Sequence, residues 1–269
     1  MTRLSLVRLS CGIALATSLA GCLASTQQEV ELGQQYAAQI NEQLPIVTDP
    51  EINRYINVLG DSIATLSDDR GLQWHFYVVN DPQLNAFAVP GGYVYVNRGI
   101  IETADNLSQL AGVMGHEIGH VLERHSMEQM RDMQRANAGV SVLCIFTSVC
   151  ESQAAGAAIN VAGSAVFARF SREDEAEADA VGVRDVMRAG IDPRGIPAMF
   201  RKLLEARQSN PDAVSAFFST HPLEEDRIAA TEAQIARIDP AILATLTRDT
   251  PAFQAFKRRV AALPAAPRK

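Results

Sequence analysis

The sequence predicts a mostly helical α+β fold that contains one small antiparallel sheet. Apolar residues recur at intervals of three and four in several long segments, which is typical of amphipathic helices. One stretch, residues 71–97, is instead rich in aromatic and β-branched residues and contains a Pro-Gly-Gly turn signal. No internal repeat is present, so we expect a single domain over residues 22–269 with a short C-terminal tail.

The first 21 residues have the layout of a secretory signal, with two arginines followed by an apolar run too short to cross a bilayer. The segment Leu19–Cys22 resembles the site at which bacterial lipoproteins are cleaved before a cysteine that is then lipidated. We therefore expect Cys22 to become the lipid-modified first residue. Leu23 favours sorting to the inner leaflet of the outer membrane. An ordinary signal followed by an unrelated cysteine is the alternative.

The charge balance argues against nucleic-acid binding. The whole chain carries a formal net charge of −7, and removal of residues 1–21 takes away two arginines and no acid, which leaves −9. Of the remaining cysteines, Cys144 and Cys150 are spaced to form a short disulfide in an oxidising periplasm. Two free thiols packed among apolar residues are the alternative.

The elements follow in order along the chain. Helical periodicity predicts helices over Ser25–Leu44, Asp49–Leu66, residues 105–126, Ser171–Ala189, Ile196–Arg207 and Leu223–Ile238. Strands are predicted at Gln73–Asn80, Ala86–Val89 and Tyr93–Val96, with Pro90–Gly92 as the turn of a hairpin. The helix at residues 105–126 starts at a good cap, Asp105 or Asn106, and its apolar residues make it the expected core of the fold.

The stretch 136–168 consists mainly of small residues and carries one charge, Glu151. We expect a buried helical hairpin near the active site, because small residues give little energy of transfer into lipid. A flap that touches the membrane is the alternative.

His116-Glu117-Ile118-Gly119-His120 is an H-E-x-x-H motif within a predicted helix. In a helix the two imidazoles lie one turn apart on one face and can reach a single metal ion. Two nitrogens and one carboxylate suit zinc and leave a fourth position for water, from which Glu117 can take a proton. The alternative is a pair of core histidines on an amphipathic helix.

The residue types alone leave the third ligand open. His125 is one residue short of the position that H-E-x-x-H-x-x-G-x-x-H enzymes require. The acidic segment 171–179 offers Glu173, Glu175 and Glu177, and residue types do not choose among them. Glu175 and Asp179 share one helical face. If Glu175 binds the metal, Asp179 can therefore orient one of the ligating histidines.

Four features in this order look together like the CAAX-prenyl-protease and HtpX family of zinc metallopeptidases: Val89–Gly92, the H-E-x-x-H helix, Ser171-Arg172 with Glu175-x-x-x-Asp179, and Thr220–Pro222 with Arg227. The match covers residues 29–238. The resemblance implies a zincin-like domain whose sheet packs on the motif helix. The resemblance is strongest to the periplasmic lipoprotein members of the family. Among these, the members without a helical-repeat domain fit this chain better than those with one.

The resemblance also implies roles for single residues. The zinc ligands fall on His116, His120 and Glu175, with one zinc per chain, and the general base falls on Glu117. His221 matches a family histidine that restrains the enzyme as an extra ligand or steadies the oxyanion. Arg227 is expected to fix its loop by pairing with Glu224 or Asp179. The exposed strand Asn85, Ala86, Phe87, Ala88 and Val89 is expected to align an extended substrate.

These expectations combine into a zinc metalloendopeptidase of the bacterial envelope, in which a zinc-bound water activated by Glu117 attacks the peptide bond. The expected substrates are unfolded or misassembled envelope proteins, and outer-membrane assembly machinery is a further expected partner. The competing hypothesis is a non-catalytic chaperone or assembly lipoprotein whose zinc site is kept shut by His221.

Overall fold

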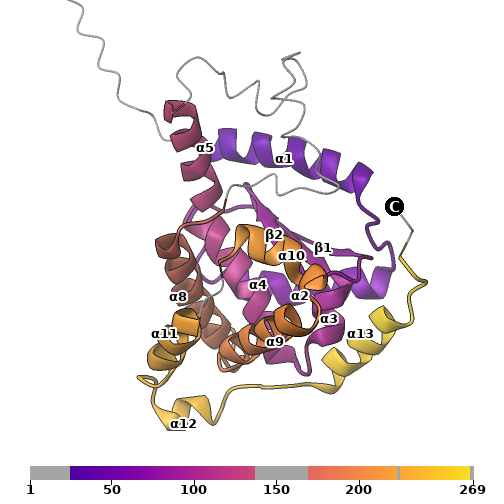
Figure 1. Ribbon diagram of the computed structural model, residues 1–269, viewed down its shortest axis with the longest axis vertical. Helices are drawn as coiled ribbons and strands as arrows, with labels where there is room; N and C mark the ends of the chain where they lie inside the picture. The colour runs from indigo at the N-terminus through magenta and orange to yellow at the C-terminus, as the bar shows by residue number, and fades with distance from the viewer. Residues whose placement is uncertain (1–24, 137–168, 223–224, 267–269) are drawn as a thin grey trace, which may run out of the picture.

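The computed structural model describes residues 25–136, 169–222 and 225–266. Helices dominate, and three short strands form one sheet (Figure 1). In chain order the elements are α1 (Thr26–Gln43), α2 (Pro50–Ala64), β1 (His75–Val79), β2 (Ala86–Val89), β3 (Tyr93–Asn97), α3 (Arg98–Thr103), α4 (Leu107–Leu122), α5 (His125–Ala136), α8 (Arg172–Arg188), α9 (Gly195–Ser209), α10 (Pro211–Thr220), α11 (Glu225–Ile235), α12 (Pro240–Leu243) and α13 (Pro251–Ala261).

The sheet is mixed, which corrects the predicted antiparallel pairing. Strands β2 and β3 form the expected hairpin, but β1 pairs parallel with β3, in the order β1-β3-β2. Strand β3 is buried along its whole length and therefore takes the centre, between the two others. The turn permits the hairpin because Gly91 and Gly92 both have positive φ, of 81° and 96°. The residues of β1 do not indicate whether it runs parallel or antiparallel to β3, because that direction depends on how the two strands pair in the fold.

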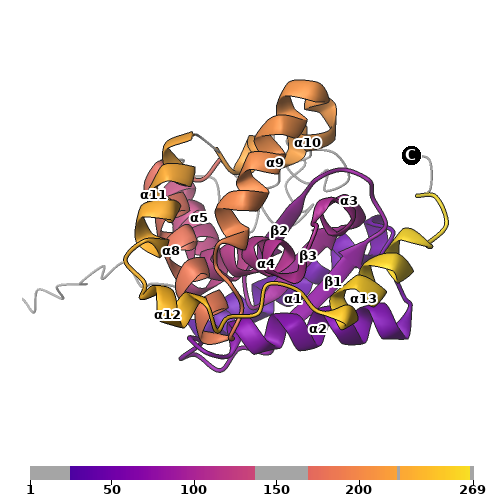
Figure 2. The same cartoon turned by 90° about the horizontal axis from the view of Figure 1, so that it is seen from below.

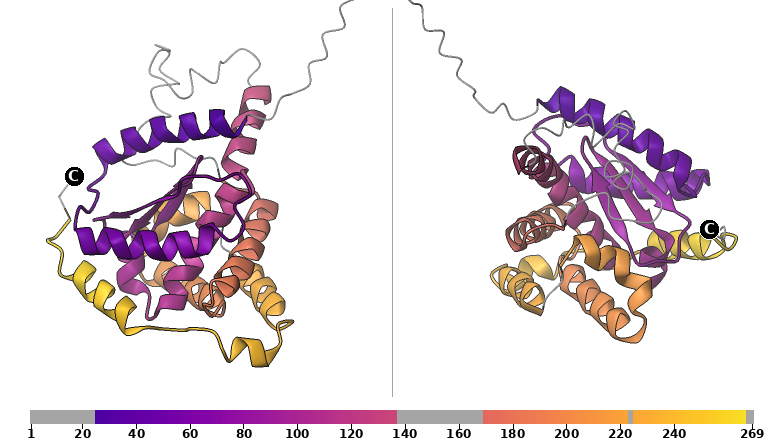
Figure 3. Two further views of the ribbon diagram at one scale, coloured as in Figure 1. Left: turned by 180° about the vertical axis from the view of Figure 1, so that it is seen from behind. Right: turned by 45° about the horizontal axis from the view of Figure 1, so that its top comes forward.

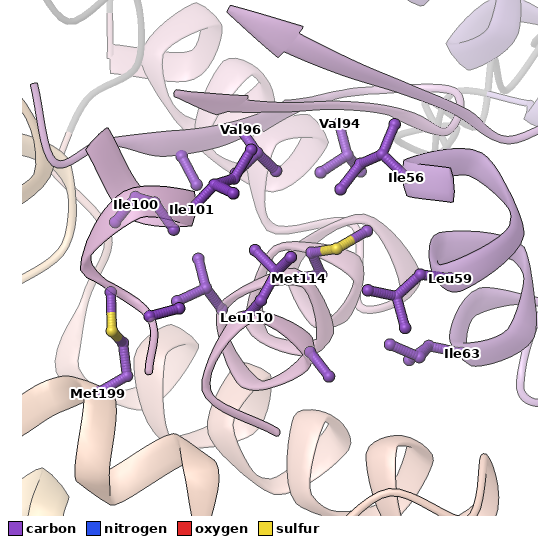
Figure 4. Close-up of a cluster of buried hydrophobic side chains, with 14 of the residues drawn as sticks. Ile56, Leu59, Ile63, Val94, Val96, Ile100, Ile101, Leu110, Met114 and Met199 are labelled. Atoms are coloured by element: carbon purple, nitrogen blue, oxygen red, sulfur yellow. The ribbon is translucent and has the colours of Figure 1, made fainter. Parts of the chain in front are cut away.

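The two faces of the sheet are covered by different helices. Helix α1 lies across one face, where its buried Tyr36, Ala37 and Ile40 pack against Val89 and Tyr95 of the hairpin (Figure 3). On the other face, β2 and β3 pack against α4. Figure 4 shows the resulting core, which includes Ile56, Leu59, Val94, Val96, Leu110 and Met114. The motif helix α4 therefore runs through the middle of the domain, as predicted.

Helix α4 begins as the sequence predicts and ends earlier than predicted. The side chain of Asn106 accepts a hydrogen bond from the backbone of Gln109 and caps the first turn. The helix ends at Leu122, because Arg124 adopts a left-handed conformation with a φ of 63°. That conformation costs a non-glycine residue about 1–2 kcal/mol. Arg124 forms an ion pair with the buried Glu29 at 2.9 Å, which helps to offset this cost.

Helix α8 confirms the predicted helix over residues 171–189. The Ser171 side chain accepts from the backbone of Asp174, and the Asp174 side chain accepts from the backbone of Ser171 in return. The chain turns away at Gly190, whose φ is 76°. Helix α8 packs along α4, and α9 contacts α4 as well (Figure 1).

The C-terminal part of the chain wraps around the outside and ends on α13, which contacts α2 and α3 (Figure 2). Phe253, Phe256 and Val260 of α13 are buried, and the Phe256 ring stacks on Tyr55 with 4.3 Å between centroids. The sequence predicted only a short C-terminal tail at this end of the domain. It is instead an ordered part of the core.

Several sequence predictions lie outside the described residues. They concern the signal segment 1–21, the lipid site at Cys22, the helical hairpin over 136–168 (of which only Ala136 is described) and the Cys144–Cys150 disulfide. None of the helices within the described ranges combines the length and the apolar character that a membrane span requires.

Candidate metal centre

Four buried side chains converge where α4, α8 and the end of α10 meet. His116 and His120 lie one turn apart on α4, Glu175 lies in the first turn of α8, and His221 follows α10 directly. One nitrogen or oxygen atom from each of these residues falls within a cluster 4.8 Å across. Each side chain is at most 2% exposed. The two predicted histidines and Glu175 are thus brought together, while Glu173 lies on an exposed part of α8.

The separations in this cluster fit a zinc ion. His116 Nε2 lies 3.0 Å from His120 Nε2 and 3.5 Å from Glu175 Oε2, and His120 Nε2 lies 3.3 Å from Glu175 Oε1. A tetrahedral zinc ion with bonds of about 2.0–2.2 Å sets neighbouring donor atoms about 3.4 Å apart. The three side chains can therefore coordinate one zinc ion without moving far.

Small residues allow α4 and α8 to approach closely enough to build the cluster. A Cβ atom added to Gly119 would lie 2.8 Å from the Ala178 carbonyl oxygen and 2.9 Å from its Cα. Gly182 faces Gly115 in the same way, with a distance of 3.2 Å from its added Cβ to the Gly115 carbonyl carbon. Side chains at these positions would push apart the helix with the histidines and the helix with Glu175.

The protonation states also suit metal binding. Burial lowers the pKa of His120 well below its ordinary value, which favours the neutral imidazole. Burial alone would raise the pKa of Glu175. Neighbouring His221 and His116 outweigh this effect and lower it, so the carboxylate is ionised. Neutral imidazole and carboxylate are the forms that bind a metal ion.

Asp179 and Arg227 surround this cluster with further polar contacts. Asp179 Oδ1 lies 2.8 Å from His116 Nδ1, on the side of the ring that faces away from the cluster. Arg227 donates to both oxygens of Asp179, at 2.8 and 2.9 Å, and also pairs with Glu175. Burial opposes ionisation of Asp179, but the hydrogen bonds from His116 and Arg227 keep its pKa below the ordinary value. Of the two predicted partners of Arg227, Asp179 is present; Glu224 lies outside the described residues.

Glu117 is buried next to the cluster, and its Oε1 atom has no hydrogen-bond partner among the described residues. Nε2 of His221 lies 3.7 Å from this oxygen, beyond hydrogen-bonding distance. Burial lowers the pKa of His221, but Glu117 and Glu175 raise it by more, so the net shift is upward. An unpartnered buried carboxylate oxygen needs a ligand or water to satisfy it, which is the arrangement expected of a general base.

Residues 85–89 include β2, which is an edge strand of the sheet and packs against α4. Contrary to the prediction of an exposed strand, the side chains of Ala86, Ala88 and Val89 are buried. The edge position follows from the order of the strands, and the burial follows from helices packed on both faces of the sheet.

No signal in the sequence predicted the aromatic rings around the cluster or the place of His125. Phe170 stacks on His120 with 4.0 Å between ring centroids, and it also lies against His221. His125, dismissed as a zinc ligand, is buried with its Nδ1 2.9 Å from His120 Nδ1. The spacing of His125 from the motif gave no signal for this contact, because the early end of α4 creates it.

Comparison with known proteins adds to this geometry. The model of Peptidase family M48 matches residues 49–235. The chain is 34% identical over 232 residues to the Beta-barrel assembly-enhancing protease of Escherichia coli K12, covering 83% of this chain and 47% of that protein. It is 30% identical over 178 residues to Mitochondrial metalloendopeptidase OMA1 of Schizosaccharomyces pombe, covering 66% of this chain and 51% of that protein. The chain spans about half the length of these relatives.

Proposed function

The chain belongs to peptidase family M48, a family of zinc metallopeptidases, and on that premise we propose that it is an endopeptidase of the bacterial cell envelope. Its substrates are unfolded or misassembled envelope proteins, including those of outer-membrane assembly. The relative named for β-barrel assembly supports this setting, as does the signal-like N-terminal segment. The proposal includes a lipid anchor at Cys22 on the inner leaflet of the outer membrane.

The observation that carries the proposed chemistry is the buried cluster itself. His116, His120 and Glu175 would hold one zinc ion, because their donor atoms have the separations that it requires. The lowered pKa values of His120 and Glu175 also favour the forms that bind a metal ion. Zinc bound there would act as a Lewis acid and increase the acidity of a water molecule. Side chains of the domain would carry out the proton transfers and hold the ligands in place.

Glu117 is proposed to be the general base and then the general acid. Its Oε1 atom takes a proton from the attacking water and later delivers it to the leaving amine. The free hydrogen-bonding capacity of Oε1 supports this role. Asp179, held by Arg227, accepts from His116 Nδ1 and so keeps Nε2 of that ring directed toward the cluster.

We propose that residues 85–89 align the substrate. An edge strand can add an extended peptide through backbone hydrogen bonds, which select an unfolded conformation more than a sequence. The position of β2 at the sheet edge, packed against the motif helix, supports this role. Recognition through the backbone also suits substrates that have lost their native structure.

The variant Glu117→Gln tests the activity. It should bind zinc as the unmodified protein does and lose cleavage of casein, an unfolded model substrate. Glu123→Gln is the matched control, since Glu123 lies just beyond α4 on the exposed surface and should leave turnover unchanged. Equal cleavage by Glu117→Gln and the unmodified protein would refute the proposed mechanism.

The second candidate function, a client-holding protein with a closed zinc site, is favoured by one observation. His221 supplies a fourth donor to the cluster, and its Nδ1 lies 2.9 Å from Glu175 Oε1. Four protein ligands leave a zinc site closed. If His221 restrains the enzyme in this way, His221→Ala should cleave casein faster. Slower cleavage would instead assign His221 to support of the reacting oxygen.

A further inference from the structure

His125 is a buried polar side chain outside the four-residue cluster. It is 1% exposed, and its ring contacts a polar group on each side. Nδ1 lies 2.9 Å from Nδ1 of His120, and Nε2 lies 3.3 Å from Oε2 of Glu177 on α8. Asp174 is farther away, at 4.0 Å from Nε2. These contacts join three side chains from α4, α5 and α8.

The break after α4 creates this arrangement. In one continuous helix, residues 120 and 125 would point about 140° apart around the axis and would not face each other. The left-handed conformation of Arg124 ends α4, and α5 then begins at His125. The turn brings the His125 ring back beside His120, with 5.0 Å between their centroids.

The direction of the hydrogen bonds follows from the cluster. Nε2 of His120 faces Nε2 of His116 and Glu175, so its lone pair must be free if it is to bind zinc. The proton of His120 then resides on Nδ1 and is donated to Nδ1 of His125. This leaves the proton of His125 on Nε2, from which it is donated to Glu177. Every nitrogen of both rings is thereby used.

We propose that His125 is a positioning residue that fixes the tautomer and orientation of the zinc ligand His120, with Glu177 as its anchor. His116 already has a carboxylate, Asp179, at the corresponding nitrogen. The two motif histidines are thus both held from α8, one directly and one through an intervening imidazole. The inference rests on the zinc site proposed above.

The same geometry excludes His125 as a ligand of the same zinc ion. It meets His120 at Nδ1, which is the ring nitrogen that points away from the cluster, and it is not a member of the cluster. Its effect on zinc therefore passes through His120. Glu177 is 66% exposed at its side chain, so its contribution should be smaller than that of His125.

Zinc affinity measured by chelator competition tests the proposal without any activity assay. His125→Phe keeps a ring of similar size and removes both hydrogen bonds, and it should weaken zinc binding about 10- to 100-fold. His125→Asn places an amide oxygen near the position of Nδ1 and should restore most of the affinity. The visible spectrum of the cobalt-substituted protein should change in His125→Phe and return toward the native one in His125→Asn.

The unfolding midpoint of the metal-free variants separates positioning from mere packing. Near-native midpoints together with weakened zinc binding support the proposal, whereas native zinc affinity in folded His125→Phe overturns it. If that variant does not fold, Glu177→Ala, which removes the acceptor of the His125 Nε2 proton, and its matched control Glu173→Ala decide. Weaker zinc binding in Glu177→Ala alone supports the proposal, and equal affinities overturn it. Failure of the unmodified protein to bind zinc would refute the zinc site itself.

Discussion

Arg227→Ala should destabilise the metal-free protein far more than the zinc-bound protein. The guanidinium donates to both oxygens of Asp179, pairs with Glu175, and lies 4.9 Å from the centroid of the Phe200 ring. Its side chain is 10% exposed, and its two carboxylate partners are 0% and 6% exposed. Removing one partner of such a buried pair costs about 3–5 kcal/mol, because the remaining charges stay buried and unpaired.

Zinc should offset part of this loss, since the ion places positive charge next to Glu175 in the absence of the guanidinium. Equilibrium unfolding in urea, with and without zinc, measures both free energies. Arg201→Ala is the matched control: Arg201 also pairs with a glutamate, Glu232, but both side chains are about half exposed, at 49% and 48%. An exposed pair contributes about 0–1 kcal/mol. If metal-free Arg227→Ala lost no more stability than Arg201→Ala, the account of a buried charge network would be wrong.

Three further predictions follow from other parts of the structure. Gly119→Ala should weaken zinc binding, because its Cβ would meet the Ala178 backbone at 2.8 Å and separate α4 from α8; chelator competition measures the loss, and native affinity would contradict the close approach. Phe256→Ala should cost about 3–5 kcal/mol in urea unfolding, with Phe256→Leu under about 1.5 kcal/mol, and neither should alter zinc affinity; a small loss in Phe256→Ala would contradict the core role of α13. The pKa of Asp179 is lowered from its ordinary value of 3.8, since His116 and Arg227 outweigh burial, so its carboxylate stabilises the fold above that pH and loses this effect as pH falls through the folded pKa. Asp179→Asn should therefore flatten the dependence of metal-free stability on pH below about pH 4, and an unchanged profile would contradict the shift.

The two helices that carry the site could be predicted because their signals are local. Apolar spacing and the cap at Asn106 predict α4, and Ser171 and Gly190 mark the two ends of α8. The H-E-x-x-H spacing places both imidazoles on one face whatever surrounds them. These features depend on residues that are only a few positions apart. Helical periodicity and capping signals involve residues at the same short separations.

The features that the sequence did not predict depend on distant contacts. Arg124 ends α4 in a conformation that glycine would normally mark, and its partner Glu29 lies on α1. The family resemblance selected Glu175, but residue types alone could not, because the choice among the glutamates depends on how α8 packs: Glu175 joins the cluster, Glu177 meets His125, and Glu173 lies on the surface. The parallel pairing of β1 likewise depends on the position of β3.

Crystals of the zinc-bound protein, with anomalous diffraction recorded at the zinc absorption edge, test the central claim most directly. The account predicts one strong peak per chain within about 2.0–2.2 Å of Nε2 of His116, Nε2 of His120 and an oxygen of Glu175. A peak at any other place, or a Glu175 carboxylate with neither oxygen within bonding distance of the metal, would contradict it.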